Sequence, residues 1–180
     1  MEIRNTLDLL ETKNRTELEQ IKLPYSDTAL SPVMSKQTID YHFGKLYKGY
    51  VDRYNKGEGD RTFNEAGAHL HSIFFAQLKS PAGRAPKGTI LTLIQRNHKN
   101  FVDFKKAFKE EAMKLQGSGW IYLSKSGQIK TIKNHAKRTD IALLVDMWEH
   151  AFNLDYGSNK AKYLDSIWRL MDWDAINRRL

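Results

Sequence analysis

Residues 141–151 read IALLVDMWEHA, and this stretch combines an apolar run with two side chains that can bind a metal ion. The apolar run, 141–145, is short enough to be a buried strand. Asp146 follows it directly, and His150 comes four residues later. A carboxylate at the end of a buried strand costs stability unless it is paired or bound to a metal ion. The alternative is that Asp146 caps a helix beginning at Trp148, which would contribute about 1 kcal/mol.

The residues before this stretch predict the rest of a small antiparallel sheet. Two further strand-like runs occur at 120–123 and 129–132, with Ser126-Gly127 in the turn between them. Together with 141–145 they predict three strands. Helices are expected around the sheet, one beginning at 90–94 and the others at 101–115, 148–152 and 160–180.

The first half of the chain predicts a helical hairpin. Ser35 is a suitable N-cap for a helix to about Asn55, and a second helix is expected over 63–78. Residues 2–20 carry apolar side chains at helical spacing and predict a lead-in helix. The expected fold class is therefore α+β, with a helical hairpin followed by an α/β portion that has a three-stranded antiparallel sheet. The expected divisions are a helical N-terminal extension (1–20), the hairpin (21–82) and the C-terminal α+β domain (83–180).

Two of the six histidines lie on apolar helix faces. His42 shares a helical row with Leu46 and Tyr50, and His71 points along the apolar face of the second helix. A buried imidazole needs a partner for each ring nitrogen, and a metal ion can be one of them. Three imidazoles and a carboxylate suit iron or manganese better than calcium, and they do not exclude zinc.

Composition narrows the classes of function. The 180 residues contain no cysteine, which excludes disulfides, zinc–thiolate sites and thiol nucleophiles. No apolar run is long enough to span a membrane, and the N-terminus does not resemble a secretory signal, so a cytoplasmic location is expected.

The net charge of +8 favours an anionic partner of some kind. Much of it lies between Lys125 and Arg138, which raises the alternative of a nucleic-acid-binding domain. The chain holds no aromatic-rich RNA motif or helix-turn-helix pattern, so nucleic acid is not the expected partner.

Several sequence blocks together resemble one known family. In order along the chain they are LPY (23–25), ALSP (29–32), residues 38–51 with Tyr41-His42, residues 63–75, GSGW (117–120), DMWEHA (146–151), Leu154-Asp155-Tyr156, Tyr163-Leu164, Trp168 and Trp173. From about Leu23 to its C-terminus the chain resembles the iron/manganese superoxide dismutases. DMWEHA is the most specific block, because it is similar to the D-x-W-E-H-A signature of that family.

The resemblance implies a site and an activity. It implies that one iron or manganese ion is bound by His42, His71, Asp146 and His150. It also implies that this ion cycles between two oxidation states while superoxide is converted to dioxygen and hydrogen peroxide.

Other positions of this sequence match residues around the metal site of the family. Trp120 and Trp148 match the aromatic walls of the metal pocket, and Tyr50 matches a gateway tyrosine that relays protons. A glutamine that often hydrogen-bonds the solvent on the metal is replaced at its two usual places by Gly67 and His135, so His135 is the expected donor. On local grounds alone, Tyr50 and the tryptophans read as core residues, and His135 as an exposed turn residue.

The resemblance also implies a homodimer, in which Glu149 reaches a metal-binding histidine of the partner subunit. Lys45 matches a lysine of the family, and Lys160 stands in place of an arginine, so both are expected to steer the anionic substrate. Leu46 and Asn153 stand where the family usually has a histidine and a tyrosine that pair across the dimer interface. Reduced activity is therefore expected, and the alternative is a metal-binding protein of this type with a structural or binding role.

Overall fold

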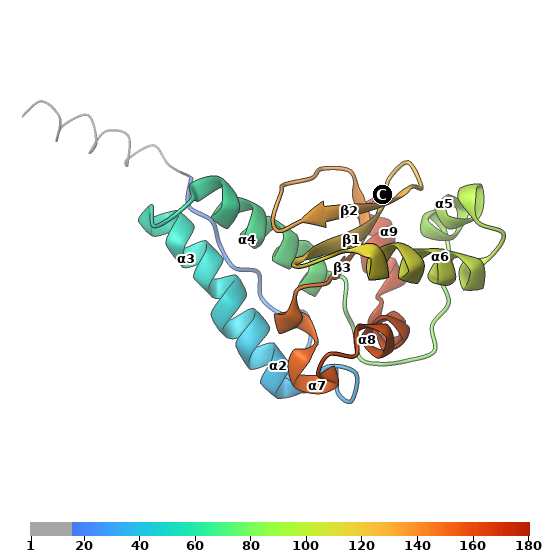
Figure 1. Cartoon of the computed structure of the whole chain (residues 1–180), viewed down its shortest axis with the longest axis horizontal. Helices are drawn as coiled ribbons and strands as arrows, with labels where there is room; N and C mark the ends of the chain where they lie inside the picture. Colours follow the sequence, from blue (N-terminus) through green and yellow to red (C-terminus); the bar gives the residue numbers. More distant parts are fainter. Residues whose placement is uncertain (1–15) are drawn as a thin grey trace, which may run out of the picture.

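Two long helical arms form the hairpin, and Figure 1 shows them diverging from the turn that joins them. In the computed structural model, which describes residues 16–180, the first arm runs continuously through α2 (Lys36–Tyr41), the π-helical segment η1 (His42–Tyr47) and α3 (Lys48–Lys56). It begins at Ser35, whose side chain accepts a hydrogen bond from the Thr38 N–H. The second arm is α4 (Arg61–Ala76), which begins at Asp60 in the same way. The predicted hairpin is confirmed.

The sheet has three antiparallel strands in the order β2-β1-β3. The strands are β1 (Gly119–Ser124), β2 (Ile129–Lys133) and β3 (Ile141–Asp146). Every residue of β1 and β3 is buried, because α4 and α9 (Trp173–Arg178) pack on β3, whereas α6 (Phe101–Lys114) packs on β1 and β2. The predicted α+β fold with its three-stranded sheet is therefore confirmed.

The remaining helices surround the sheet and are mostly short. They are α5 (Thr89–Asn97), α6 (Phe101–Lys114), the 3-10 turn η2 (Glu149–Ala151), α7 (Asn153–Tyr156), α8 (Lys160–Ser166), the 3-10 turn η3 (Ile167–Leu170) and α9 (Trp173–Arg178). Within residues 16–180, no helix is both long and apolar enough to cross a membrane.

The expectation of one helical stretch over 160–180 was wrong. Met171 leaves the helical path and forms an isolated bridge with Leu78, which joins the C-terminal segment to the end of α4. Asp172 then begins a new helix, since its carboxylate accepts hydrogen bonds from the N–H groups of Asp174 and Ala175.

The lead-in helix expected over 2–20 is also wrong for its described part. Residues 1–15 lie outside the described part of the chain, and residues 16–20 are not helical. Their backbone bonds instead to the hairpin. Leu18 exchanges two hydrogen bonds with the side chain of Asn55, and the Ile21 N–H donates to the Tyr47 hydroxyl. The division of the chain near residue 82 stays a prediction.

Helix α7 is attached to the beginning of the hairpin by hydrogen bonds between residues far apart in sequence. The Asp155 carboxylate accepts from the Ser35 N–H at 2.9 Å and from the Thr38 hydroxyl at 2.8 Å. The Tyr156 hydroxyl donates to the Val33 carbonyl at 2.6 Å. These contacts hold the segment that follows β3 against the arm that carries His42.

Candidate metal centre

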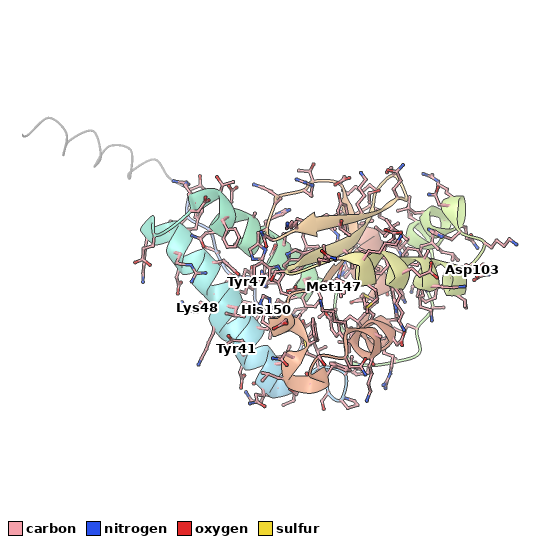
Figure 2. The ribbon with its side chains drawn as sticks, in the orientation of Figure 1. Tyr41, Tyr47, Lys48, Asp103, Met147 and His150 are labelled. Carbon is pink, nitrogen blue, oxygen red and sulfur yellow. The ribbon has the colours of Figure 1, made fainter. Side chains whose placement is uncertain are left out.

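Three histidine side chains converge on one carboxylate oxygen. The Nε2 atoms of His42, His150 and His71 lie 3.0, 3.1 and 3.7 Å from Oδ2 of Asp146. One ligand atom from each of the four residues lies within 4.8 Å of the other three. His42, His71 and Asp146 are fully buried, and only His150 reaches the surface, with its side chain 11% exposed. In Figure 2, His150 lies where the first arm of the hairpin faces the rest of the molecule.

Each residue of this cluster comes from a different element. His42 begins η1, His71 lies in the second half of α4, Asp146 ends β3, and His150 is in the η2 turn. The helix that Asp146 was expected to cap is not formed, because a 3-10 turn with Trp148 at its N-cap follows β3 instead. Asp146 Oδ1 accepts a hydrogen bond from the Trp148 N–H at 2.8 Å and so fixes the turn, whereas Oδ2 faces the imidazoles.

The π-helical turn changes which residue lies on the same face of the helix as His42. Sequence periodicity placed Leu46 on the same row as His42, but a π-helix adds one residue to the turn. The residue that is buried beside the cluster is Tyr47, five positions after His42, and Leu46 is only partly buried. The Tyr47 ring stacks on His71, with 5.7 Å between ring centres. No sequence signal indicates Tyr47, because the helical period alone does not reveal a π-turn.

His71 is held in the tautomer that a metal-binding histidine needs. Its Nδ1–H donates to the Gly67 carbonyl at 2.7 Å, which leaves the lone pair on Nε2. That Nε2 is buried and has no hydrogen-bond partner among residues 16–180. A buried nitrogen without a partner costs stability, and a metal ion would remove that cost.

The protonation states of the cluster favour cation binding. Burial, reinforced by the charge of His150, lowers the pKa of His42 to about 4. Burial and the charge of His42 lower the pKa of His71 well below its usual value. Burial alone would raise the pKa of Asp146, but the charge of His150 and the close imidazoles of His150 and His42 outweigh it, so the pKa is lowered. At neutral pH, His42 and His71 therefore have free lone pairs and Asp146 is negative.

The spacing of the cluster fits one shared ion. Atoms bound to one ion at about 2.1 Å lie about 3.0 to 3.6 Å apart when their bonds make angles of about 90 to 120°. Of the distances from Asp146 Oδ2, 3.0 and 3.1 Å lie within that range and 3.7 Å lies just above it. Three imidazoles and one carboxylate are a donor set for iron or manganese.

Two models of known protein domains match this chain. The model of the alpha-hairpin domain of iron/manganese superoxide dismutases matches residues 17–61, and that of their C-terminal domain matches residues 86–179. The chain belongs to the iron/manganese superoxide dismutase family.

Relatives of this family align with almost the whole chain. Superoxide dismutase [Fe] of Bacteroides fragilis is 36% identical, over 90% of this chain and 98% of that protein. Superoxide dismutase [Mn/Fe] of Porphyromonas gingivalis is 35% identical, over 89% and 98%. Superoxide dismutase [Fe] of Sulfolobus acidocaldarius is 35% identical, over 88% and 91%.

His135 packs against the cluster instead of lying exposed in a turn. It is 8% exposed, and its ring centre lies 4.8 Å from that of Tyr50 and 5.8 Å from that of His71. Its Nδ1 accepts a hydrogen bond from the Trp120 indole N–H at 3.1 Å. Burial lowers the pKa of His135 to about 4, so the neutral ring carries its proton on Nε2. This Nε2 is buried without a hydrogen-bond partner among the described residues.

The two tryptophans pack against imidazoles of the site. Trp120 is fully buried and meets His71 edge-on, with 5.0 Å between ring centres. Trp148 stacks on His135 at 4.5 Å and on His150 at 5.4 Å. Asn134, with a left-handed backbone (φ 54), turns the chain so that His135 enters this aromatic wall.

Gly67 makes room for Tyr50. A Cβ atom at position 67 would lie 2.9 Å from the Tyr50 ring, closer than a side chain can approach. Tyr50 itself is 7% exposed, and its ring centre is 5.3 Å from that of His71. Burial, followed by the charge of Asp146, raises the pKa of Tyr50 to about 12, so its hydroxyl is protonated at neutral pH.

The residues expected to steer the substrate lie in two different surface hollows. Lys160 and the exposed Glu149 line a hollow of about 380 Å³ together with His150. Lys45 lies instead in a hollow beside Tyr41 and Leu154. Of the two lysines, only Lys160 shares a hollow with a residue of the metal cluster.

Replacing a residue of the cluster should abolish metal retention. We expect the variants His71→Ala and Asp146→Ala to lose bound iron or manganese, because each removes one of four converging ligands. The control is His69→Ala, two residues away on α4, where the imidazole bonds to the Arg138 carbonyl. Elemental analysis of the purified proteins measures the result. Unchanged metal content in either cluster variant would contradict the assignment.

The metal-free protein should lose stability as the solution becomes acidic. An unfolded histidine binds a proton below a pH of about 6.5, whereas folded His42 stays neutral down to about 4. The unfolded state therefore binds more protons in this range, and the free energy of unfolding falls by up to about 1.4 kcal/mol per pH unit for each such histidine.

Urea unfolding of the metal-free protein between neutral pH and pH 4 tests this pH dependence. The His42→Leu variant lacks one titrating group, so its free energy of unfolding should depend less steeply on pH. A flat profile for the unmodified chain over this range would show that the imidazoles are not buried in their neutral form.

Proposed function

We infer that the chain is a superoxide dismutase that uses one iron or manganese ion. The observation that supports this most is the buried convergence of three imidazole nitrogens on one carboxylate oxygen in a chain of this family. When bound, iron or manganese supplies redox chemistry, taking an electron from one superoxide and passing it to a second. The products are dioxygen and, after uptake of two protons, hydrogen peroxide.

The four cluster residues would hold the ion and leave the site positively charged. Neutral imidazoles of His42 and His71 and the negative carboxylate of Asp146 cancel only one unit of the charge of a +2 or +3 ion. The remaining positive charge favours an anionic substrate inside an apolar pocket, where electrostatic attraction is only weakly screened. Burial of three of the four side chains also keeps bulk water away from the centre.

His135 is the proposed hydrogen-bond donor to solvent at the ion. The Trp120 N–H occupies Nδ1, so the proton of the neutral ring is on Nε2. That N–H is buried and without a partner among the described residues, which makes it available to a water molecule in the pocket. A fixed donor of this kind favours one charge state of the solvent over the other and so tunes the redox potential.

Tyr50 is the proposed proton donor near the substrate. Its hydroxyl stays protonated at neutral pH, and its ring lies against both His71 and His135. The absence of a side chain at Gly67 supports this role, because any larger residue would displace the ring.

Superoxide would reach the site on a basic surface. Lys160 lines the hollow that contains His150, and the net charge of +8 attracts anions over a longer range. Lys45 would add to this attraction from its own hollow beside Tyr41 and Leu154. A cytoplasmic location stays a prediction.

A homodimer is the proposed assembly. Tyr41 and Leu154 are 42% and 50% exposed and line one hollow with Lys45, so apolar surface is available there for a partner. Glu149 is exposed nearby in sequence, as a contact to the partner subunit requires. Leu46, which is partly buried, and Asn153, which is exposed, stand where the family usually has a histidine and a tyrosine. A leucine and an asparagine cannot form that hydrogen-bonded pair. Slower proton delivery is the expected consequence.

Metal analysis together with a superoxide-consumption assay tests the proposed function. We expect about one iron or manganese ion per chain and metal-dependent consumption of superoxide. The variant His135→Leu should keep its metal and lose activity by about tenfold or more, as for other residues that hydrogen-bond around a metal site. The control His98→Leu, at the end of α5, should keep its activity. Bound metal without catalysis would favour the structural or binding role instead.

A further inference from the structure

Strand β3 has a free edge that two side chains cover. Because the sheet order is β2-β1-β3, the outer backbone groups of β3 have no neighbouring strand within residues 16–180. The Leu144 N–H donates to Gln77 Oε1 at 3.2 Å, and Gln77 Nε2 donates to the Leu144 carbonyl. The side-chain amide of Gln77 thus takes the place of a fourth strand at this residue.

Arg179 supports Gln77 from the C-terminus. Its Nη2 donates to Gln77 Oε1 at 2.9 Å and to the Ala142 carbonyl at 2.6 Å, and its Nε donates to the same carbonyl at 3.2 Å. Gln77 is fully buried, so these bonds replace its contacts with water completely. We call Gln77 and Arg179 together the edge clamp.

The edge clamp connects two elements that carry residues of the metal cluster. Gln77 directly follows α4 and lies six residues after His71. Leu144 lies two residues before Asp146 in β3. The main chain of Gln77 is also fixed, since its carbonyl accepts from the Asp172 N–H at 2.8 Å. The clamp spans His71 and Asp146, and His71 Nε2 is the imidazole nitrogen farthest from Asp146 Oδ2, at 3.7 Å compared with 3.0 Å for His42 and 3.1 Å for His150.

We propose that Gln77, supported by Arg179, is a positioning residue of the metal centre that sets the separation of His71 and Asp146 and thereby the rate of metal release. Loss of the amide would let the end of α4 and the edge of β3 move independently. The ligands on them would then hold the ion less firmly, although neither ligand had changed. This proposal depends on the metal site of the proposed function and is independent of dismutation.

A second polar anchor provides a comparison that is only structural. Asn177 also fastens the C-terminal helix, because its Oδ1 accepts from the Ile90 N–H and its Nδ2 donates to the Lys87 carbonyl. These bonds join α9 to the beginning of α5, and neither helix carries a residue of the cluster. Loss of Asn177 should therefore lower stability and leave the metal site unchanged.

The test compares Gln77→Met with Asn177→Leu, since both changes remove hydrogen bonds and nearly keep the side-chain volume. Each protein is loaded with manganese(II), and release of the ion to a chelator is timed under conditions where circular dichroism shows the chain folded. We expect about tenfold or faster release from Gln77→Met and a change within about twofold for Asn177→Leu. The electron paramagnetic resonance spectrum of the bound manganese should change only in Gln77→Met.

Equal release rates and unchanged spectra in both variants would overturn the proposal. If Gln77→Met does not fold, Arg179→Met decides, with its exposed neighbour Arg178→Met as the control. Faster release from Arg179→Met alone supports the clamp, and equal rates reject it. An unmodified chain that bound no manganese would overturn both this proposal and the proposed function. An unmodified chain that bound it without dismuting superoxide would overturn only the proposed function.

Discussion

The structure depends on the burial of one negative carboxylate among three imidazoles. Asp146 is fully buried, and no arginine or lysine forms a salt bridge with it among the described residues. A charge in such a place is stable only if hydrogen bonds or a cation compensate it. The imidazoles do so in part, and those of His42 and His71 are themselves buried, with ring nitrogens that lack hydrogen-bond partners among the described residues. An ion bound by His42, His71, Asp146 and His150 would satisfy all four side chains together.

The fold brings these four side chains together from segments that are far apart in sequence. The hairpin contributes two imidazoles, and β3 with its following turn contributes the carboxylate and the third imidazole. Hydrogen bonds between Asp155 and the beginning of α2, and between Gln77 and β3, fix these segments relative to one another. Aromatic rings fill the space around the cluster, so it is held in a closely packed apolar setting.

Much of the fold could be predicted from the sequence, because its signals are local. Ser35 caps the first arm, the apolar runs mark the three strands, and Ser126-Gly127 marks their turn. The two helix predictions that failed, over 2–20 and over 160–180, concern segments whose conformation depends on contacts with distant parts of the chain. Residues 16–20 bond to the hairpin instead of forming a helix, and Met171 leaves the helical path to pair with Leu78.

In the site, too, local patterns could be predicted from the sequence and long-range contacts could not. The apolar faces indicated His42 and His71, and the resemblance to the family supplied the full set of four and the place of His135. The sequence could not reveal the tautomer of His135, which depends on Trp120, or the space that Gly67 leaves for Tyr50. It also could not reveal Tyr47, since the register of a π-turn is set by packing.

Anomalous diffraction from crystals of the metal-loaded protein tests the central claim most directly. The account predicts one strong anomalous peak at the absorption edge of iron or manganese, within bonding distance of Nε2 of His42, His71 and His150 and of Oδ2 of Asp146. A peak at another place, or none in a protein that retains its metal in solution, would contradict the account.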